Sequence, residues 1–244
     1  MGNDAFWSGV PFGPGVTLIL ADANGVAAFA KPAGILSHPN RKGEESHSLI
    51  RAAYVLGGEY YVWGDPPRKL WLLNRLDAAT SGVILAAAVS ELAAEIRGRF
   101  KRREVGKVYQ ALVFGRPARD AETWSDRLAV DKSGGRIRTG PGPIPAECAM
   151  KLIGGSADRT VSLLQLEPRT GRSHQLRVQC ANRHLPIVGD QTYGEFPRNR
   201  AFAKRTGVKR LFLHSLSTRF AYAWGGRTHV FSAEAPLPAE FLVS

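Results

Sequence analysis

Short apolar runs, separated by turns rich in Gly, Pro and polar residues, recur along the chain and predict a protein built mainly from β-strands. In segment 16–34 the pair Asn24-Gly25 predicts a hairpin with a two-residue turn, because these residues adopt the positive φ angles that such turns need. The pair Gly225-Gly226 predicts a second hairpin within 210–236. The other expected strands are 70–77, 81–89, 107–115 and 159–168.

Fewer segments have the pattern of helices. Segment 91–103 begins with Glu and ends with Lys and Arg, which complements the helix dipole, and Ser90 is its expected N-cap. Segment 173–183 is a second expected helix, and 41–69 is expected to combine a short helix with a Gly/Pro loop. Strands outnumber helices and do not alternate with them regularly. The expected fold class is therefore α/β of the α+β type, with a central mixed, mostly antiparallel β-sheet flanked by helices and loops.

The chain of 244 residues is long enough for one large domain or two small ones, with a sizeable core. The Gly- and Pro-rich residues 1–15 are expected to form an arm on the surface, followed by a single domain over 16–244. Segment 115–145 is expected to be a long excursion or a pair of edge strands. Its basic residues are Arg116, Arg119, Arg127, Lys132, Arg136 and Arg138. They form either a flap that binds phosphates or a solvated loop.

The charge balance changes the picture from a generic globular protein to one with an anionic partner. The net charge is +12 and the pI is about 10.2. Such an excess of cations is typical of proteins that bind nucleic acid, because each cation placed on a phosphate releases a condensed counterion. A basic protein without a role in nucleic-acid binding is the alternative that composition alone leaves open.

Cysteine usage and hydropathy point to a reducing compartment. Cys148 and Cys180 lie far apart without C-x-x-C spacing, so neither a disulfide framework nor a zinc site is expected. The first residues do not form a signal peptide, and no apolar run is long enough to span a bilayer. We therefore expect a cytoplasmic protein, away from the membrane and acting as a monomer.

Three groups of polar residues interrupt otherwise apolar segments. In the first, Arg75 and Asp77 follow an apolar run, and on a strand their side chains share one face. The alternative for Asp77 is an Asx turn with its own backbone. In the second group, Lys107 and Tyr109 share one face of an expected strand, where Tyr109 either offers a ring for stacking and a hydroxyl that needs a partner or is an ordinary core tyrosine.

The third group lies at the start of the helix expected near Ser173. Its basic residues are Arg169, Arg172, His174 and Arg177. A helix start that follows arginines attracts phosphate through its exposed N–H groups and through side-chain charge, and His174 and Arg177 are spaced to share one helix face. A metal site of His174, His184 and Asp190 matches no familiar ligand spacing, and none is expected.

Together these segments resemble the RluA-like family of pseudouridine synthases. The matching segments follow the family's order and approximate spacing, and they are 31–39, 74–87, 107–115, 169–194 and 210–220. The resemblance implies a cofactor-free isomerase that converts selected uridines of ribosomal or transfer RNA into pseudouridine. It also implies the family's mostly antiparallel sheet, with an RNA-binding cleft along it.

The same resemblance implies a role for single residues. Asp77 corresponds to the catalytic aspartate, Tyr109 to the tyrosine that packs on the target base, and Arg177 to the basic residue that pairs with the aspartate. Arg75 corresponds to the arginine that helps to hold a flipped nucleotide outside the RNA helix. The further expected substrate-binding residues are Lys107, Arg169, Arg172 and His174.

The chain departs from the family pattern in two places. Many relatives have histidine where this chain has Asn74, so no proton-transfer role is expected at that position. Many relatives also carry an N-terminal S4 RNA-binding domain, for which the residues before Val16 are too few, so RNA affinity is expected from the catalytic domain itself.

Two other function classes compete with the isomerase. A non-catalytic RNA-binding or ribosome-assembly factor has no need for a carboxylate in a basic cleft, where it repels phosphate. A metal-dependent nuclease needs clustered carboxylates to bind cations, and Asp77 has no acidic neighbour in its motif.

Overall fold

A computed structural model of the chain describes residues 3–130, 137–139 and 142–242. The chain divides into two compact units. The first unit consists of residues 1–106 and 215–236, and the second of residues 107–214 and 237–244. Within the part of the chain that the structure describes, no helix is both long and apolar enough to cross a membrane.

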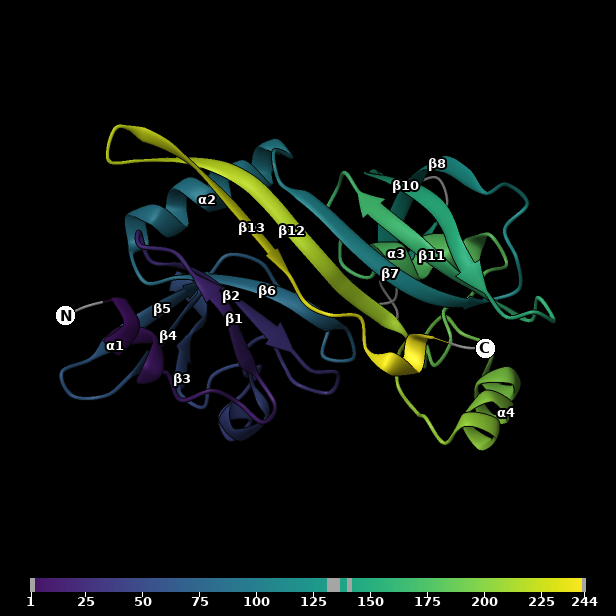
Figure 1. The fold of residues 1–244 in the computed structure, drawn as a ribbon, viewed down its shortest axis with the longest axis horizontal. Helices are drawn as coiled ribbons and strands as arrows, with labels where there is room; N and C mark the ends of the chain where they lie inside the picture. The colour runs from purple at the N-terminus through teal and green to yellow at the C-terminus, as the bar shows by residue number, and fades with distance from the viewer. Residues whose placement is uncertain (1–2, 131–136, 140–141, 243–244) are drawn as a thin grey trace. The chain divides into compact units, whose positions relative to one another are not determined.

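The first unit is built on antiparallel strands (Figure 1). Adjacent strands follow the order β3 (Ala53–Val55), β4 (Tyr60–Trp63), β5 (Arg68–Leu72), β6 (Ser81–Ala87) and β12 (Leu213–Trp224). The branches of this order are β1 (Thr17–Ala21) on β2 (Val26–Lys31), β2 on β6, and β13 (Arg227–Glu234) on β12. Strand β6 is buried along its whole length; it pairs with β2 through Gly82–Ala87 and with β5 at Ala86 and Ala87.

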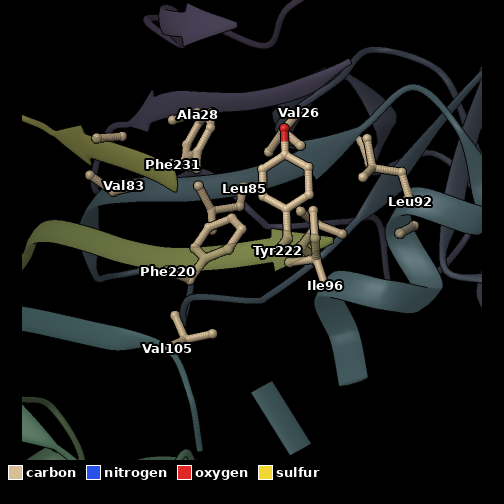
Figure 2. Close-up of a cluster of buried hydrophobic side chains, with 14 of the residues drawn as sticks. Val26, Ala28, Val83, Leu85, Leu92, Ile96, Val105, Phe220, Tyr222 and Phe231 are labelled. Carbon is tan, nitrogen blue, oxygen red and sulfur yellow. The ribbon is translucent and has the colours of Figure 1, made fainter. Parts of the chain in front are cut away.

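The core of the first unit lies between this sheet and helix α2 (Ser90–Arg102). Figure 2 shows Leu92 and Ile96 of α2 in the same cluster as Phe220 and Tyr222 of β12. The helix expected at 91–103 is therefore confirmed by its buried apolar face. The expected cap is wrong, because the Ser90 hydroxyl donates to Glu91 Oε2 and the N-cap position is Val89 without a side-chain cap.

Both expected hairpins form, but only one has the expected two-residue turn. Gly225 and Gly226 have φ angles of 56° and 74°, which confirms a two-residue turn between β12 and β13. The β1–β2 connection is longer than the expected two-residue turn, because the Asp22 N–H donates to the Val26 carbonyl oxygen. Of the expected pair Asn24-Gly25, only Gly25 has a positive φ, at 97°. The Asp22 carboxylate accepts the Val26 N–H at 2.9 Å and organises this wider loop.

The expectations for segments 1–15 and 41–69 are wrong in part. The segment expected to contain a short helix forms strands β3 and β4 with 3₁₀ turns at Glu45–His47 and Leu56–Gly58, because its Tyr-, Val- and Trp-rich stretch suits a pleated, half-buried surface. The expected surface arm contains helix α1 (Asn3–Ser8), whose Trp7 is only 3% exposed. Trp7 packs edge-on against Phe29 of β2, so this side chain attaches the segment to the core.

The second unit has a second run of antiparallel strands (Figure 1). Their order is β7 (Gly106–Phe114), β11 (Val161–Pro168), β10 (Ile144–Gly155), β8 (Ala121–Val130) and β9 (Ile137–Thr139). Its helical elements are α3 (Gln175–Asn182), α4 (Phe196–Thr206) and a 3₁₀ turn at Ala239–Phe241. Segment 115–145, expected as a long excursion or a pair of edge strands, contains β8 and β9; β8 pairs with both β10 and β9, so it is not an edge strand.

The basic residues of that segment have mixed outcomes. Lys132 and Arg136 lie outside the described residues, and Arg138 lies in β9. Arg127 donates from Nε to Gly142 O at 2.6 Å, so it ties β8 to the chain that follows β9. Arg116 forms an exposed ion pair with Asp120 at 3.2 Å. The phosphate-binding flap remains a hypothesis.

Candidate active site

Arg75 and Asp77 lie in the loop between β5 and β6 of the first unit. Strand β5 ends at Leu72, so the expectation that both residues share one face of a strand is wrong. Asp77 is half-buried and its carbonyl accepts the Thr80 N–H at 3.0 Å, which closes a turn. Arg75 is exposed, with its guanidinium 3.9 Å from the Glu59 carboxylate.

Asn74 has a structural role at the point where β5 separates from β6. Its Oδ1 accepts the Leu85 N–H at 2.8 Å, while Leu73 Nα donates to Leu85 O at 3.0 Å. The side chain thus continues the hydrogen-bonding ladder after the backbone has turned away. This explains an asparagine at a position for which we expected no proton transfer.

The loop around Asp77 is fixed by the segment that follows β2. The Ser37 hydroxyl donates to the Leu76 carbonyl oxygen at 2.7 Å, and its Oγ accepts the Leu76 N–H at 2.9 Å. On the other side of Asp77, the Ala78 carbonyl oxygen accepts hydrogen bonds from the Gly34 N–H at 2.8 Å and from the Lys31 ammonium at 3.0 Å. Both neighbours of the carboxylate-bearing residue are therefore attached to one loop.

Lys31 is an unusual anchor because its side chain is buried with a charged head. The residue is 1% exposed, and Nζ also donates to Ile35 O at 2.6 Å and to Pro32 O at 3.0 Å. These carbonyl oxygens accept hydrogen bonds from the buried ammonium and so offset part of its loss of hydration. Sequence reasoning placed 31–39 in a matching segment but gave neither Lys31 nor Ser37 a role.

Strand β6 begins with a close backbone approach that only glycine permits. Gly82 has a φ of 112°, and a Cβ atom there would lie 2.1 Å from the Ser215 carbonyl oxygen of β12. Thr80 and Ser81 before it are buried. The small residues after Asp77 therefore bring the loop back tightly into the sheet.

Replacing Ser37 by Ala is expected to lower the free energy of unfolding by about 2 kcal/mol, because two buried backbone groups of Leu76 lose their partner. The measurement is equilibrium unfolding in urea. The matched control is Ser46→Ala, an exposed serine bonded to its neighbour His47, which should change stability by less than about 0.5 kcal/mol. Equal effects of the two substitutions would contradict the anchoring role of Ser37.

In the second unit, Arg177 forms a buried, bidentate ion pair with Asp190. Arg177 Nε lies 2.7 Å from Asp190 Oδ2, and Nη2 lies 2.8 Å from Oδ1. Burial by itself raises the pKa of Asp190, but hydrogen bonds from Arg177 and from the N–H groups of Tyr193 and Thr192 hold that pKa below its usual value. Asp190 therefore fixes the Arg177 guanidinium; the pairing of Arg177 with Asp77 remains a prediction.

Tyr193 connects this ion pair to His174. The Arg177 guanidinium lies 5.2 Å from the centre of the Tyr193 ring, and His174 Nδ1 lies 2.9 Å from the Tyr193 hydroxyl. Helix α3 begins at Gln175, and His174 before it has a φ of 52°, so the expected helical face shared by His174 and Arg177 is wrong. The two residues nevertheless contact the same tyrosine.

The turn before α3 is fixed by buried amide groups rather than by its arginines. Gln175 Oε1 accepts the Thr170 hydroxyl at 2.8 Å and the Arg172 N–H at 3.1 Å, while Gln175 Nε2 donates to Glu147 O at 3.1 Å. Arg169 pairs with the Glu147 carboxylate at 2.6 Å. The guanidinium groups of Arg169 and Arg172 stand at the surface of this turn.

Lys107 reaches the same turn from β7. Its Nζ lies 3.6 Å from the point where a Cβ atom of Gly171 would stand, and burial lowers the pKa of this ammonium. Tyr109 lies two residues along β7 and opposite Leu166 of β11. The second unit thus brings together the Lys107 ammonium, the Arg169–Arg172 turn and the start of α3.

The expected site residues therefore fall into two groups. Arg75 and Asp77 belong to the first unit. The residues of the second unit are Lys107, Tyr109, Arg169, Arg172, His174 and Arg177. Sequence reasoning missed Asp190 and Tyr193, although both stand in the matching segment 169–194, because only their contacts with Arg177 and His174 reveal a role.

Comparisons with known proteins agree on one family. Residues 25–182 match the model of the family described as RNA pseudouridylate synthase. The tRNA pseudouridine synthase C of Vibrio cholerae is 30% identical over 210 residues, which cover 82% of this chain and 83% of that protein. The ribosomal large subunit pseudouridine synthase C of the same organism is 32% identical over 155 residues, covering 64% of this chain and 48% of that protein.

A solved structure supports the same fold. The structure of human RNA pseudouridylate synthase domain containing 1 aligns with a TM-score of 0.67 and 22% identity, and covers 93% of this chain and 86% of that one. This likeness confirms the expected α+β fold class.

Proposed function

Since this chain belongs to the RluA-like family of RNA pseudouridylate synthases, we propose that it isomerises uridine in transfer or ribosomal RNA with Asp77 as the catalytic carboxylate. Family membership makes the chain an isomerase that acts on RNA. The proposal concerns the residues that carry the reaction and the RNA class. The observation that carries the assignment of Asp77 is the anchoring of both its neighbours, Leu76 and Ala78.

The reaction asks for a carboxylate in a fixed position. The bond from uracil N1 to ribose C1′ must break, the base must turn, and C5 must join C1′. A carboxylate beside the sugar acts either as a nucleophile at C1′ or as a base at C2′, and both routes pass through a positively polarised sugar. A loop whose neighbouring residues are anchored keeps Asp77 in one orientation, which lowers the entropy loss of reaching that geometry.

Arg177 and Arg75 have proposed roles on either side of this step. Following the family resemblance, Arg177 pairs with Asp77 and keeps it ionised in a cleft that excludes water. The pair with Asp190 supports this role, because it fixes the rotamer of a guanidinium that is 7% exposed. Arg75 is exposed in the same loop as Asp77 and holds the flipped nucleotide outside its helix.

The remaining basic residues are proposed to bind substrate phosphates. The Arg169 and Arg172 side chains stand at the surface of the turn before α3, and Lys107 and His174 lie beside or directly after this turn. Arginine forks and backbone N–H groups near a helix start suit phosphate oxygens. These four residues therefore provide a phosphate-binding edge in the second unit.

We propose that the enzyme works as a monomer in the cytoplasm. Both cysteines are buried and free, and burial raises the pKa of the Cys148 thiol to about 12. A thiol with so high a pKa stays protonated and resists oxidation. The absence of a disulfide between the two described cysteines supports the proposal of a reducing compartment.

The test of the isomerase is tritium release from RNA labelled with ³H at uridine C5. Forming the bond between C5 and C1′ must expel that hydrogen, whichever uridine is modified. The substrate is RNA from cells of the source organism that lack this protein, fractionated into transfer and ribosomal RNA. Release from one fraction identifies the RNA class, and no release from either would contradict the proposal.

Replacing Tyr109 by Phe is expected to lower the single-turnover rate of tritium release by roughly 10²-fold, because the ring still stacks on the base while the hydroxyl that assists proton removal from C5 is lost. RNA affinity should stay within about twofold of the wild type. The matched variant Tyr109→Leu removes the ring as well and should also weaken binding. A wild-type rate for Tyr109→Phe would restrict Tyr109 to packing.

A further inference from the structure

Helix α4 presents a line of exposed side chains that the reaction does not use. Phe196, Arg200 and Lys204 are spaced four residues apart, so they follow one another along one face of the helix, about 6 Å apart along its axis. Arg200 and Lys204 are exposed, and Phe196 is 46% exposed. These three residues form the α4 line (α4 in Figure 1).

The opposite face attaches α4 to the loop that carries Asp190. Asn199 is buried, accepts the Gly189 N–H on Oδ1 at 2.7 Å and donates from Nδ2 to the Asp190 carbonyl at 3.0 Å. Phe202 is also buried and contacts Phe114 and Phe212 edge-on. The inner face thus accounts for the stability of the helix, and the α4 line is not needed for it.

The segment 196–210 is strongly and uniformly basic. It contains six Lys and Arg residues and no Asp or Glu. Arg198 and Arg210 pair with Glu195 and Glu240. The exposed remainder is Arg200, Lys204, Arg205 and Lys209.

The helix dipole explains only part of this charge. Lys204 and Arg205 lie in the last turn, where cations are favourable. Arg200 lies in the middle of the helix, and neither Arg200 nor Lys204 forms an ion pair with a residue that the structure describes. Cations kept at such positions, without a carboxylate in the whole segment, suit an external polyanion.

Building on the proposed function, we propose that the α4 line is an RNA-docking surface that binds one strand of the substrate outside the reacting nucleotide. Arg200 and Lys204 contact phosphates, and Phe196 offers its ring to an unpaired base. Cations combined with an exposed aromatic ring are the recognition chemistry of a single nucleic-acid strand, since the ring accepts any base and the cations follow the backbone. The surface therefore contributes affinity, while the chemical step occurs elsewhere.

The test is the double variant Arg200→Gln/Lys204→Gln, which removes two charges and keeps long, helix-compatible side chains. The probe is RNA labelled with ³H at uridine C5, from cells lacking the protein, used for both filter binding and tritium release. We expect the dissociation constant to rise about tenfold and the slope of log affinity against log salt to become shallower by about 1.5. The single-turnover rate at saturating RNA should stay within about twofold of the wild type.

The matched control is Lys101→Gln/Arg103→Gln at the end of α2, which removes the same charge from another exposed basic segment. We expect it to change affinity by less than about twofold, well below the effect of losing two phosphate contacts. Equal weakening by the two double variants would show that net charge, and not the α4 line, governs binding, and would overturn the proposal. Unchanged binding by the α4 variant would overturn it as well.

A separate variant tests the proposed contact between Phe196 and an unpaired base. Phe196→Leu keeps an apolar side chain without the ring, and we expect about tenfold weaker binding with an unchanged salt slope, because stacking carries no charge. Wild-type affinity of this variant would remove Phe196 from the surface. If the wild type binds RNA but releases no tritium, the proposed function fails, while the comparison of binding constants still decides the role of α4.

Discussion

Replacing Asp77 by Asn is expected to lower tritium release by at least about 10⁴-fold while the protein stays folded and still binds RNA. The amide has nearly the shape of the carboxylate, but at neutral pH it is neither a nucleophile nor a base. Both neighbours of Asp77 are fixed through their own backbone groups, so the loop keeps its conformation in the variant. The measurement is single-turnover tritium release, with filter binding and thermal melting on the same preparations.

The matched control for Asp77 is Asp120→Asn, the same chemical change at an exposed carboxylate. It should release tritium at the wild-type rate. A folded Asp77→Asn variant with the wild-type rate would show that another group carries the reaction. A wild type that binds RNA without any tritium release would favour the non-catalytic binding factor.

The strands that carry the proposed site could be predicted because local patterns determine them. Alternation of apolar and polar residues and the Gly225-Gly226 turn were sufficient for β7, β11 and the β12–β13 hairpin. The end of β5 could not be predicted in the same way. It depends on Asn74, whose side chain bonds to Leu85 eleven residues later and replaces a backbone ladder.

The supports of the site depend on contacts that are distant in sequence. Ser37 and Leu76 are separated by 39 positions, and Lys31 and Ala78 by 47. A serine or lysine in a Gly/Pro loop gives no local signal of such a partner. The resemblance to a family identified Asp77, but only the folded loop shows what fixes it.

Both ends of helix α4 have local sequence signals, but its apolar pattern is too weak to predict a helix. Pro197 lies in its first turn and Gly207, with a φ of 73°, ends it, which is the usual arrangement at the two ends of a helix. Its apolar stripe is reduced to Phe202 beside the buried Asn199, so a search for apolar periodicity finds little. A helix stabilised by amide contacts with a loop is difficult to detect from hydrophobicity alone.

Replacing Asp190 by Asn is expected to lower the free energy of unfolding by about 3–5 kcal/mol, because the variant removes the charged partner from a buried, bidentate ion pair with Arg177. The measurement is equilibrium unfolding in urea at about pH 7. The matched control is Glu195→Gln, which breaks the half-exposed pair with Arg198 and should lower stability by less than about 1 kcal/mol. Similar losses from the two substitutions would contradict the role of Asp190 as the support of Arg177.

The difference in free energy of unfolding between wild type and Asp190→Asn should depend on pH if it is electrostatic in origin. The pKa of Asp190 is lowered in the folded protein from its ordinary value of 3.8: burial opposes the charged form, but hydrogen bonds from Arg177 and two backbone N–H groups outweigh it. A lowered carboxyl pKa contributes stability that is fully present above the unfolded pKa and is lost as the pH falls through the folded pKa. The stability gap between wild type and Asp190→Asn should therefore be constant at neutral pH and narrow below about pH 4. A gap that stays constant to about pH 2 would mean that lost packing, rather than lost charge, destabilises the variant.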